Sequence, residues 1–299
     1  MKKISWSFFL MIFSLAQYAV FCQDNQVVIK IDSLSKDVYM LTGRGGNIGI
    51  YIGTHHVFMI DDQFDRLSDK IKGTISTLTN KPISFLLNTH MHGDHTGGNA
   101  KFNVPNTTIV AHENVRERVK TNQAKKLEKG EINMEYFNKM LPELTYSDHI
   151  TFYDGDEIIR AFHVLNAHTD GDTMVFFEKN NVLHMGDTYF AGRYPYIDLN
   201  SGGSVDGYIK AHKTALSVID DNTVIIPGHG RPSSKEALQS YIRMLEDIKL
   251  KMEAAILAGK SLEEVKDDTS ISGNYDATHG SGYIDPIQLR TTFYNSLKE

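Results

Sequence analysis

The sequence predicts a mixed α/β fold, and two observations support that prediction. Short apolar or alternating runs fill the first part of the chain, and from residue 66 onward such runs alternate with segments whose apolar residues recur at helical spacing. The composition is that of an ordinary globular domain, with 41% hydrophobic and 23% charged residues among 299. Because a chain of this length can bury a large core without a partner, we expect one main domain.

The N-terminal residues predict a secretory signal. Two lysines precede an apolar stretch over residues 4–21 that has small residues near its end, and we place cleavage near Cys22 and Gln23. Residues 1–22 would then be removed, and residues 23–299 would form a periplasmic or secreted domain with no stable membrane insertion. A membrane anchor is the alternative, although polar residues interrupt the apolar stretch.

Cys22 is the only cysteine in the sequence, which limits the disulfides and thiolate metal ligands that the mature chain can have. Lipid attachment at Cys22 is an alternative to simple cleavage, but Phe21 occupies a position where such sites have a small residue. A chain cut after Cys22 contains no cysteine, so we expect no disulfide and no thiolate metal ligand. The net charge of −6 gives none of the basic excess typical of nucleic-acid binders, and the expected partner is a small-molecule substrate.

Strands and helices are expected in alternation. Turns separate four early strand-like runs, VVIKI, VYMLT, IGIYIG and VFMIDD, and a helix over residues 66–80 leads to a strand over residues 83–87. The charged segment 114–140 predicts a helix or a mobile excursion over the surface. A further helix is expected over residues 207–219. Later strands are expected at residues 158–165, 173–178, 181–185 and 223–227.

Residues 233–299 are expected to form a helical extension that packs onto the domain. Ser233 and Glu236 predict a capping box, and the apolar stripe that follows predicts a long amphipathic helix ending near Gly259. Ser261 repeats the capping pattern ahead of a short second helix, and the last residues predict one more.

The stretch LLNTHMHGDHTGGN, residues 86–99, predicts a metal site. His90 and His92 lie two residues apart in an extended segment, so their side chains can point to the same side. Asp94 and His95 follow where the chain turns, which allows four metal-binding side chains to converge on one small volume. This spacing is a strong signal for a metal centre.

Three later segments repeat one arrangement, in which an apolar run ends in a residue that can bind metal. FHVLNAHTDGD contains His168, NVLHMGD contains Asp187, and VIIPGHG contains His229. Strand ends are where α/β folds place their sites, because the loops can diverge while the strands hold them rigidly. The sequence therefore predicts one site at one sheet edge.

These motifs resemble those of the metallo-β-lactamase superfamily of zinc hydrolases. The resemblance covers roughly residues 27–232 and rests on HMHGDH with the following TGGN, on HTDGD, on GDTYF and on PGHG, in that order. It implies a four-layer αββα sandwich that holds two metal ions, with Asp187 bridging them. One metal would be held by His90, His92 and His168, and the other by Asp94, His95 and His229.

The residue types favour zinc on chemical grounds. Imidazoles with a few carboxylates suit Zn²⁺, whereas an all-carboxylate site would suit magnesium or calcium. Iron is the alternative, although the relatives that hold two irons resemble His-x-Glu-x-Asp at the first motif and this chain has His92 there. Two metals would activate a water at neutral pH without a Ser or Cys nucleophile, and Asp94 is the expected catalytic residue, binding metal and orienting the hydroxide.

The resemblance leaves the substrate open among cyclic amides such as β-lactams, lactones, other esters and thioesters. Lactamases with a cysteine ligand are excluded by the cysteine count, and Asp187 looks more like the lactonase and thioesterase branches. Three alternatives stay open: a thioesterase of the glyoxalase II type, a single-iron sulfur dioxygenase, and a periplasmic metal-binding protein without activity. Tyr189 and Tyr194 are expected to contact substrate, with core packing as the alternative.

Overall fold

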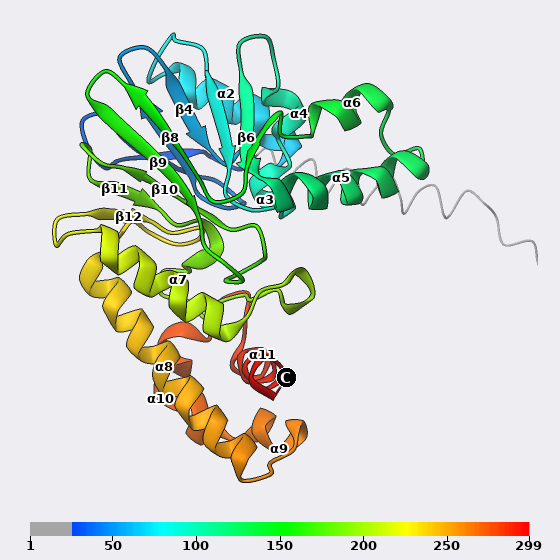
Figure 1. Ribbon diagram of the computed structural model, residues 1–299, viewed down its shortest axis with the longest axis vertical. Coiled ribbons are helices and arrows are strands. Elements are labelled where there is room, and N and C mark those ends of the chain that lie inside the picture. The colour runs from blue at the N-terminus through cyan, green and yellow to red at the C-terminus, as the bar shows by residue number, and fades with distance from the viewer. Residues whose placement is uncertain (1–25, 299) are drawn as a thin grey trace, which may run out of the picture.

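Two stacked β-sheets form the centre of the protein, and helices cover their outer faces (Figure 1). The computed structural model describes residues 26–298, so the signal predicted over residues 1–22 lies outside the described residues. This layering confirms the predicted αββα sandwich. Within residues 26–298, no helix is both long enough and apolar enough to cross a membrane.

The first sheet has seven strands that lie in chain order. Its first four strands are antiparallel and joined by short turns, whereas the fourth to seventh are parallel and need helical crossovers. The strands are β1 (Lys30–Ser33), β2 (Val38–Thr42), β3 (Ile48–Ile52), β4 (Val57–Ile60), β5 (Phe85–Asn88), β6 (Thr108–His112) and β7 (Leu144–Tyr146). The connecting helices are η1 (Asp65–Leu67), α2 (Ser68–Ser76), α3 (Gly93–Thr96), α4 (Asn99–Phe102), α5 (Glu113–Glu128) and α6 (Met134–Lys139).

The second sheet has six strands in the order β13-β12-β11-β10-β9-β8. Only β11 and β12 are parallel, and α7 (Val205–Val218) connects them. The strands are β8 (His149–Asp154), β9 (Glu157–His163), β10 (Thr173–Phe177), β11 (Val182–His184), β12 (Val224–Ile226) and β13 (Ser233–Ser234). Two short 3₁₀ helices, η2 (Gly186–Thr188) and η3 (Leu199–Ser201), lie between β11 and α7.

Alternating side chains divide the core into layers. Met40 of β2 faces the second sheet, whereas the next residue, Leu41, faces α2. This is the period of two expected of a strand that has cover on both sides. Ile71 and Ile75 of α2 lie fully or almost fully buried on the outer face of the first sheet. The first sheet is thus packed between the second sheet and α2.

Four helices occupy residues 235–298; the first lies beside α7 on the outer side of the second sheet, and the other three pack against it and one another. They are α8 (Lys235–Leu257), α9 (Leu262–Asp267), α10 (Thr269–His279) and α11 (Pro286–Lys298). The cap of α8 differs from the prediction, because the side chain of Ser234 and not Ser233 accepts the hydrogen bond from an N-terminal amide. The capping box predicted at Ser261 is present.

Candidate metal centre

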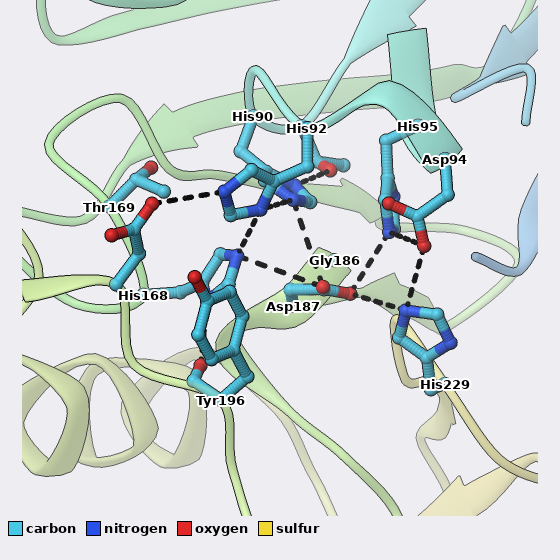
Figure 2. A network of polar contacts seen from close by, with 12 residues as sticks. His90, His92, Asp94, His95, His168, Thr169, Gly186, Asp187, Tyr196 and His229 are labelled. Carbon is cyan, nitrogen blue, oxygen red and sulfur yellow. Dashed lines mark hydrogen bonds and ion pairs between the residues drawn. The ribbon is translucent and has the colours of Figure 1, made fainter. Parts of the chain in front are cut away.

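The seven side chains predicted as ligands converge at one edge of the sandwich (Figure 2). They follow the ends of β5, β9, β11 and β12, so both sheets contribute. Within each of two groups, the ligand-type atoms all lie within 4.8 Å of one another. The first group contains His90, His92, His168 and Asp187, and the second contains Asp94, His95 and His229.

Three imidazole nitrogens face one another in the first group. Nδ1 of His92 lies 3.1 Å from Nε2 of His90 and 2.9 Å from Nε2 of His168. The Oδ2 atom of Asp187 lies 3.7 Å from each of those two Nε2 atoms. His92 is 20% exposed while the other members are buried, so this group opens to solvent on the His92 side.

Oxygen atoms outside the group set the tautomers of two of these rings. Nδ1 of His168 lies 2.7 Å from the carbonyl oxygen of Tyr196, and Nε2 of His92 lies 3.1 Å from Oδ2 of Asp198. A carbonyl or ionised carboxylate oxygen can only accept, so each of these outer nitrogens carries the ring proton. The inner nitrogens, Nε2 of His168 and Nδ1 of His92, therefore present lone pairs to the centre.

A hydroxyl group sets the tautomer of the third ring, that of His90. Nδ1 of His90 lies 3.1 Å from Oγ1 of Thr89, and that hydroxyl donates its own proton to Asp61. Oγ1 of Thr89 therefore accepts from His90, which leaves Nε2 of His90 unprotonated. Three lone pairs at about 3 Å repel one another unless a cation lies between them.

The second group meets the first at Asp187. Nε2 of His95 lies 3.1 Å from Oδ1 of Asp187, and Nε2 of His229 lies 3.4 Å from the same oxygen. Oδ2 of Asp94 lies 3.3 Å from Nε2 of His229. Asp187 thus directs Oδ1 to the second group and Oδ2 to the first, which is the arrangement of a bridging carboxylate.

Two atoms of the centre are buried polar atoms without a hydrogen-bond partner among residues 26–298. They are Nε2 of His95 and Oδ1 of Asp187. Nδ1 of His95 donates to Asp61 over 2.7 Å, so in the neutral ring Nε2 is an acceptor that faces a second acceptor. Leaving such groups unsatisfied costs about 1–3 kcal/mol each. A divalent cation would satisfy both, and the donor set of imidazoles and carboxylates fits one.

Electrostatics favour positive charge on the two histidines of the second group, whereas burial lowers the pKa of His90 and His168 in the first. Burial opposes a charge on His95, but the carboxylates of Asp187, Asp61 and Asp94 outweigh it and raise its pKa well above the ordinary value. The same balance, dominated after burial by Asp187, raises the pKa of His229 to about 9. Burial raises the pKa of the Asp187 carboxyl, but His95 and His229 hold it well below its usual range. Without a metal, the second group therefore holds protons on His95 and His229.

A strained turn after β4 places Asp61. Asp61 and Gln63 have φ angles of 61° and 57°, in the left-handed region that non-glycine residues rarely adopt. The turn is held by Asp61 N–H, which donates to the carbonyl of Leu87, and by Gln63 Nε2, which donates to the carbonyl of Gly46. Strain of this kind is characteristic of functional sites. Here it directs one carboxylate at both Thr89 and His95.

The HTDGD motif holds His168 through its two carboxylates. Oδ2 of Asp172 accepts the backbone N–H groups of His168 and Thr169 over 2.6 and 2.7 Å. Asp170 forms a two-pronged ion pair with Arg118 of α5, at 2.6 and 2.7 Å. The Asp172 carboxylate fixes the turn that carries His168, and the Asp170 carboxylate joins this turn to α5.

A hollow of about 440 Å³ lies over the open side of the centre. His92, Asp94 and His229 form its floor, and an apolar wall surrounds them. The wall contains Phe64, Phe190, Tyr194, Tyr196, Tyr283 and Ile284, the last two from the C-terminal region. This hollow is the place for a small-molecule substrate.

The structure corrects one expectation about the aromatic residues. Tyr194 lines the hollow, but Tyr189 does not, because its ring packs in the core against Tyr241 and His212. Its hydroxyl lies 2.9 Å from Oγ of Ser233. Tyr189 is therefore a core residue, and it does not line this hollow.

Sequence reasoning missed three contributors to the site. Asp61 and Asp198 orient His95 and His92, and Tyr283 supplies part of the wall. Asp61 had a detectable signal, because the DDQF run directly follows an apolar strand that neighbours the strand before His90. Asp198 and Tyr283 lie in loops with no such signal.

The profile of one known family matches most of the chain. The metallo-beta-lactamase superfamily matches residues 41–229, a range that contains all seven clustered side chains. The chain belongs to the metallo-beta-lactamase superfamily. Membership together with the His/Asp cluster indicates a metal-dependent hydrolase, as the motifs predicted.

Solved metallo-beta-lactamases share the fold. The DIM-1 metallo-beta-lactamase is 18% identical, with a TM-score of 0.59 over 74% of this chain and 99% of its own. A metallo-beta-lactamase from Pontibacter korlensis is 15% identical, with a TM-score of 0.58 over 73% of this chain and 99% of its own. The inverting sec-alkylsulfatase Pisa1 from Pseudomonas sp. is 14% identical, with a TM-score of 0.67 over 89% of this chain and 50% of its own.

Proposed function

We propose that this protein is an exported hydrolase that holds two zinc ions and opens a small cyclic amide, lactone or other ester. The observation that carries the proposal is the position of Asp187, whose two oxygens face separate groups of donors. One carboxylate shared in this way suits a pair of cations, and imidazole-rich groups suit zinc. Export rests on the predicted signal over residues 1–22.

The side chains divide into holding and reacting roles. His90, His92 and His168 would hold one zinc, Asp94, His95 and His229 the other, and Asp187 would lie between them. When bound, a zinc pair lowers the pKa of a bound water toward neutrality and polarises a substrate carbonyl. The carboxylates of Asp61 and Asp198 orient two of the metal-binding rings. They keep His95 and His92 in the tautomers that metal binding requires.

Asp94 is the side chain placed to act on the attacking water. It is 27% exposed, on the open face of the centre, and lines the hollow where substrate would lie. Burial raises the pKa of its carboxyl, but His95 and His229 outweigh burial and lower the pKa below the ordinary value. Asp94 is therefore ionised at neutral pH, and it can accept a hydrogen bond from the water and orient it toward the substrate.

Metal analysis with a double variant tests the proposal. We expect about two zinc ions per chain in the wild type and loss of both metal and hydrolysis in His90→Ala/Asp94→Ala. His149→Ala is the matched control, because His149 is an exposed histidine at the start of β8 and outside the centre. The panel of substrates contains β-lactams, lactones, simple esters and thioesters.

The alternative functions predict a different metal content or a different set of cleaved substrates for the same protein samples. One iron per chain with oxygen uptake would identify a sulfur dioxygenase, and cleavage of thioesters alone would identify a thioesterase. Zinc retained without hydrolysis of any substrate would identify a metal-binding protein. The N-terminal sequence of the protein recovered from its native host tests cleavage near residue 22.

Hydrolysis of sulfate esters is a second candidate. The match to the sec-alkylsulfatase covers 89% of this chain, whereas the match to the DIM-1 lactamase covers 74%. Secondary alkyl sulfates therefore belong in the panel. Release of sulfate without cleavage of any carbonyl compound would favour this candidate over the first.

A further inference from the structure

A further hollow, of about 740 Å³, lies between the helices α5 and α6 and the loop over residues 91–97. Figure 1 shows the two helices extending away from the sheets, and we call this cavity the α5–α6 hollow. Among residues 26–298, its lining contains none of the seven clustered side chains. It shares Phe64 and Gly93 with the hollow over the metal centre. The α5–α6 hollow therefore adjoins the proposed substrate site but is a separate cavity.

Hydrogen bonds hold the walls of the α5–α6 hollow in place. The hydroxyl of Tyr136 on α6 donates to Oδ2 of Asp65 over 2.9 Å, which joins α6 to η1. The side chain of buried Asn99 donates to the carbonyl of Met140 over 2.9 Å, just after α6 ends. The segment 114–140, expected as a helix or a mobile excursion, thus forms helices that are tied to the sandwich. A preformed cavity loses less entropy when it binds a ligand.

A buried glutamine lies in the wall formed by α5. The buried residues of this helix are Val115, Val119 and Gln123, which recur every four residues. A helix that packs on a globular core usually has an apolar residue at each such position. Gln123 lines the hollow and is 7% exposed, and its Oε1 is buried without a hydrogen-bond partner within residues 26–298. Because an unpaired buried amide costs free energy, a ligand that supplies the missing hydrogen bond would be favoured.

The charged side chains around the hollow favour an anion. Four cations and two carboxylates line it, namely Arg66, Lys125, Lys126, Lys129, Asp65 and Glu131. The carboxylate of Asp65 already accepts the hydroxyl of Tyr136. Lys126 and Lys129 are exposed and form no ion pair and no side-chain hydrogen bond in the described part of the chain. These two lysines can therefore bind a negatively charged group.

Apolar side chains form much of the remaining lining. Val119 of α5 and Met140 belong to one buried cluster, and Met91 packs against it. Met91 and Gly93 flank His92 in the chain, so a molecule in this hollow would lie against the loop that carries metal-binding side chains. The hollow thus combines an apolar surface, a buried amide and a cationic rim.

We propose that the α5–α6 hollow binds a second small molecule, an aliphatic carboxylate that has a hydroxyl group close to its charged end. Gln123 and Lys126 are three residues apart on α5, so their side chains are neighbours on the helix surface. This spacing suits a hydroxyl and a carboxylate that are separated by a few atoms, as in a 3-hydroxy acid. A hydroxyl both donates and accepts, so it can pair with either end of the Gln123 amide. The carboxylate binds Lys126 and Lys129, and the aliphatic chain packs on Met91 and Val119.

Calorimetric titration tests this site. The probes are 3-hydroxydecanoate, decanoate and 1,3-decanediol, titrated into the full-length protein as purified with its metal. Decanoate lacks the hydroxyl, and we expect it to bind about fivefold more weakly than the hydroxy acid. The diol lacks the charge, and we expect it also to bind about fivefold more weakly than the hydroxy acid.

Two variants remove the two contacts separately. Gln123→Met keeps an unbranched side chain without the amide, and it should remove the preference for the hydroxy acid over decanoate. Lys126→Gln/Lys129→Gln should reduce the preference over the diol to less than about twofold. Lys120→Gln/Lys139→Gln is the matched control, because it removes the same charge from exposed lysines of α5 and α6 that do not line the hollow. The control should keep both preferences.

The affinities for the simpler probes distinguish loss of a contact from loss of folding. Gln123→Met should bind decanoate as the wild type does, and Lys126→Gln/Lys129→Gln should bind the diol as the wild type does. Either preference persisting in the variant designed to remove it would mean that the acid binds elsewhere, such as at the metal ions, and would overturn the site. No measurable binding of 3-hydroxydecanoate to the wild type would also overturn it. None of the probes has a bond to hydrolyse, so failure of the proposed function would leave this measurement intact.

Discussion

Asp61 and His95 form a fully buried pair, in which Oδ2 of Asp61 lies 2.7 Å from Nδ1 of His95. The contact sets the ring of His95 so that its other nitrogen faces Asp187. The same carboxylate accepts the backbone N–H and the hydroxyl of Thr89, next to His90. One carboxylate behind the centre therefore supports both donor groups.

Asp61→Asn should weaken binding of one metal by about 10–100-fold. Asparagine adopts the left-handed backbone of this position readily, so the turn should survive. Its amide cannot replace both oxygens as acceptors, so either Thr89 or His95 loses its partner. Competition with a chelator measures the affinity, and Asp156→Asn, at an exposed carboxylate, is the control. Two metals held as tightly as in the wild type would contradict the role of Asp61.

Gly46→Ala should displace the ring of His95 and destroy the second donor group. A Cβ at Gly46 would lie 2.1 Å from that ring, which buried neighbours hold in place. Gly73→Ala is the control, because a Cβ there meets nothing within 4 Å and the residue lies inside α2. The control should keep its metal and gain up to about 1 kcal/mol in the free energy of unfolding. Metal content and thermal unfolding distinguish the two, and a metal-replete Gly46→Ala protein would refute the steric argument.

Metal affinity should fall as the pH falls. The pKa of His229 in the metal-free chain is raised to about 9, so below pH 9 this ring carries a proton that the metal must displace. The pKa of His95 is also raised well above its ordinary value, so the metal displaces two protons and its apparent affinity falls about a hundredfold per pH unit between pH 8 and 6. The pKa of Asp187 is held low, so its carboxylate adds no competing proton in that range. Chelator competition at pH 6, 7 and 8 checks the slope, and an affinity independent of pH would contradict it.

Tyr283→Ala should raise KM for substrates with an aromatic group while leaving kcat and metal content unchanged. Tyr283 is 79% exposed and lines the hollow, so its loss removes wall contact without a core defect. One lost aromatic contact of about 1 kcal/mol corresponds to about a fivefold change. Tyr153→Ala is the control, because Tyr153 is 74% exposed and lies on β8. An unchanged KM would show that the wall does not contact substrate.

Several strands and helices followed directly from local pattern, and others did not. The alternation in β2 and the apolar stripe of α8 carry the periods of a strand and a helix over several residues. The strand β6 escaped prediction because five residues, nearly all buried in the middle of a parallel sheet, show no alternation. Ser234 caps α8 in place of Ser233 because β13 holds both serines extended against β12 and the helix begins only at Lys235.

The sequence by itself determined which side chains meet at the centre, because ligands in one motif are placed by backbone geometry and the remaining ones follow ends of strands. The tertiary structure alone decided what surrounds them. Asp61 and Asp198 reach their histidines from 34 and 106 residues away, and Tyr189 lies in the core instead of the wall. Such contacts depend on how two sheets and the C-terminal helices pack, which local spacing does not encode.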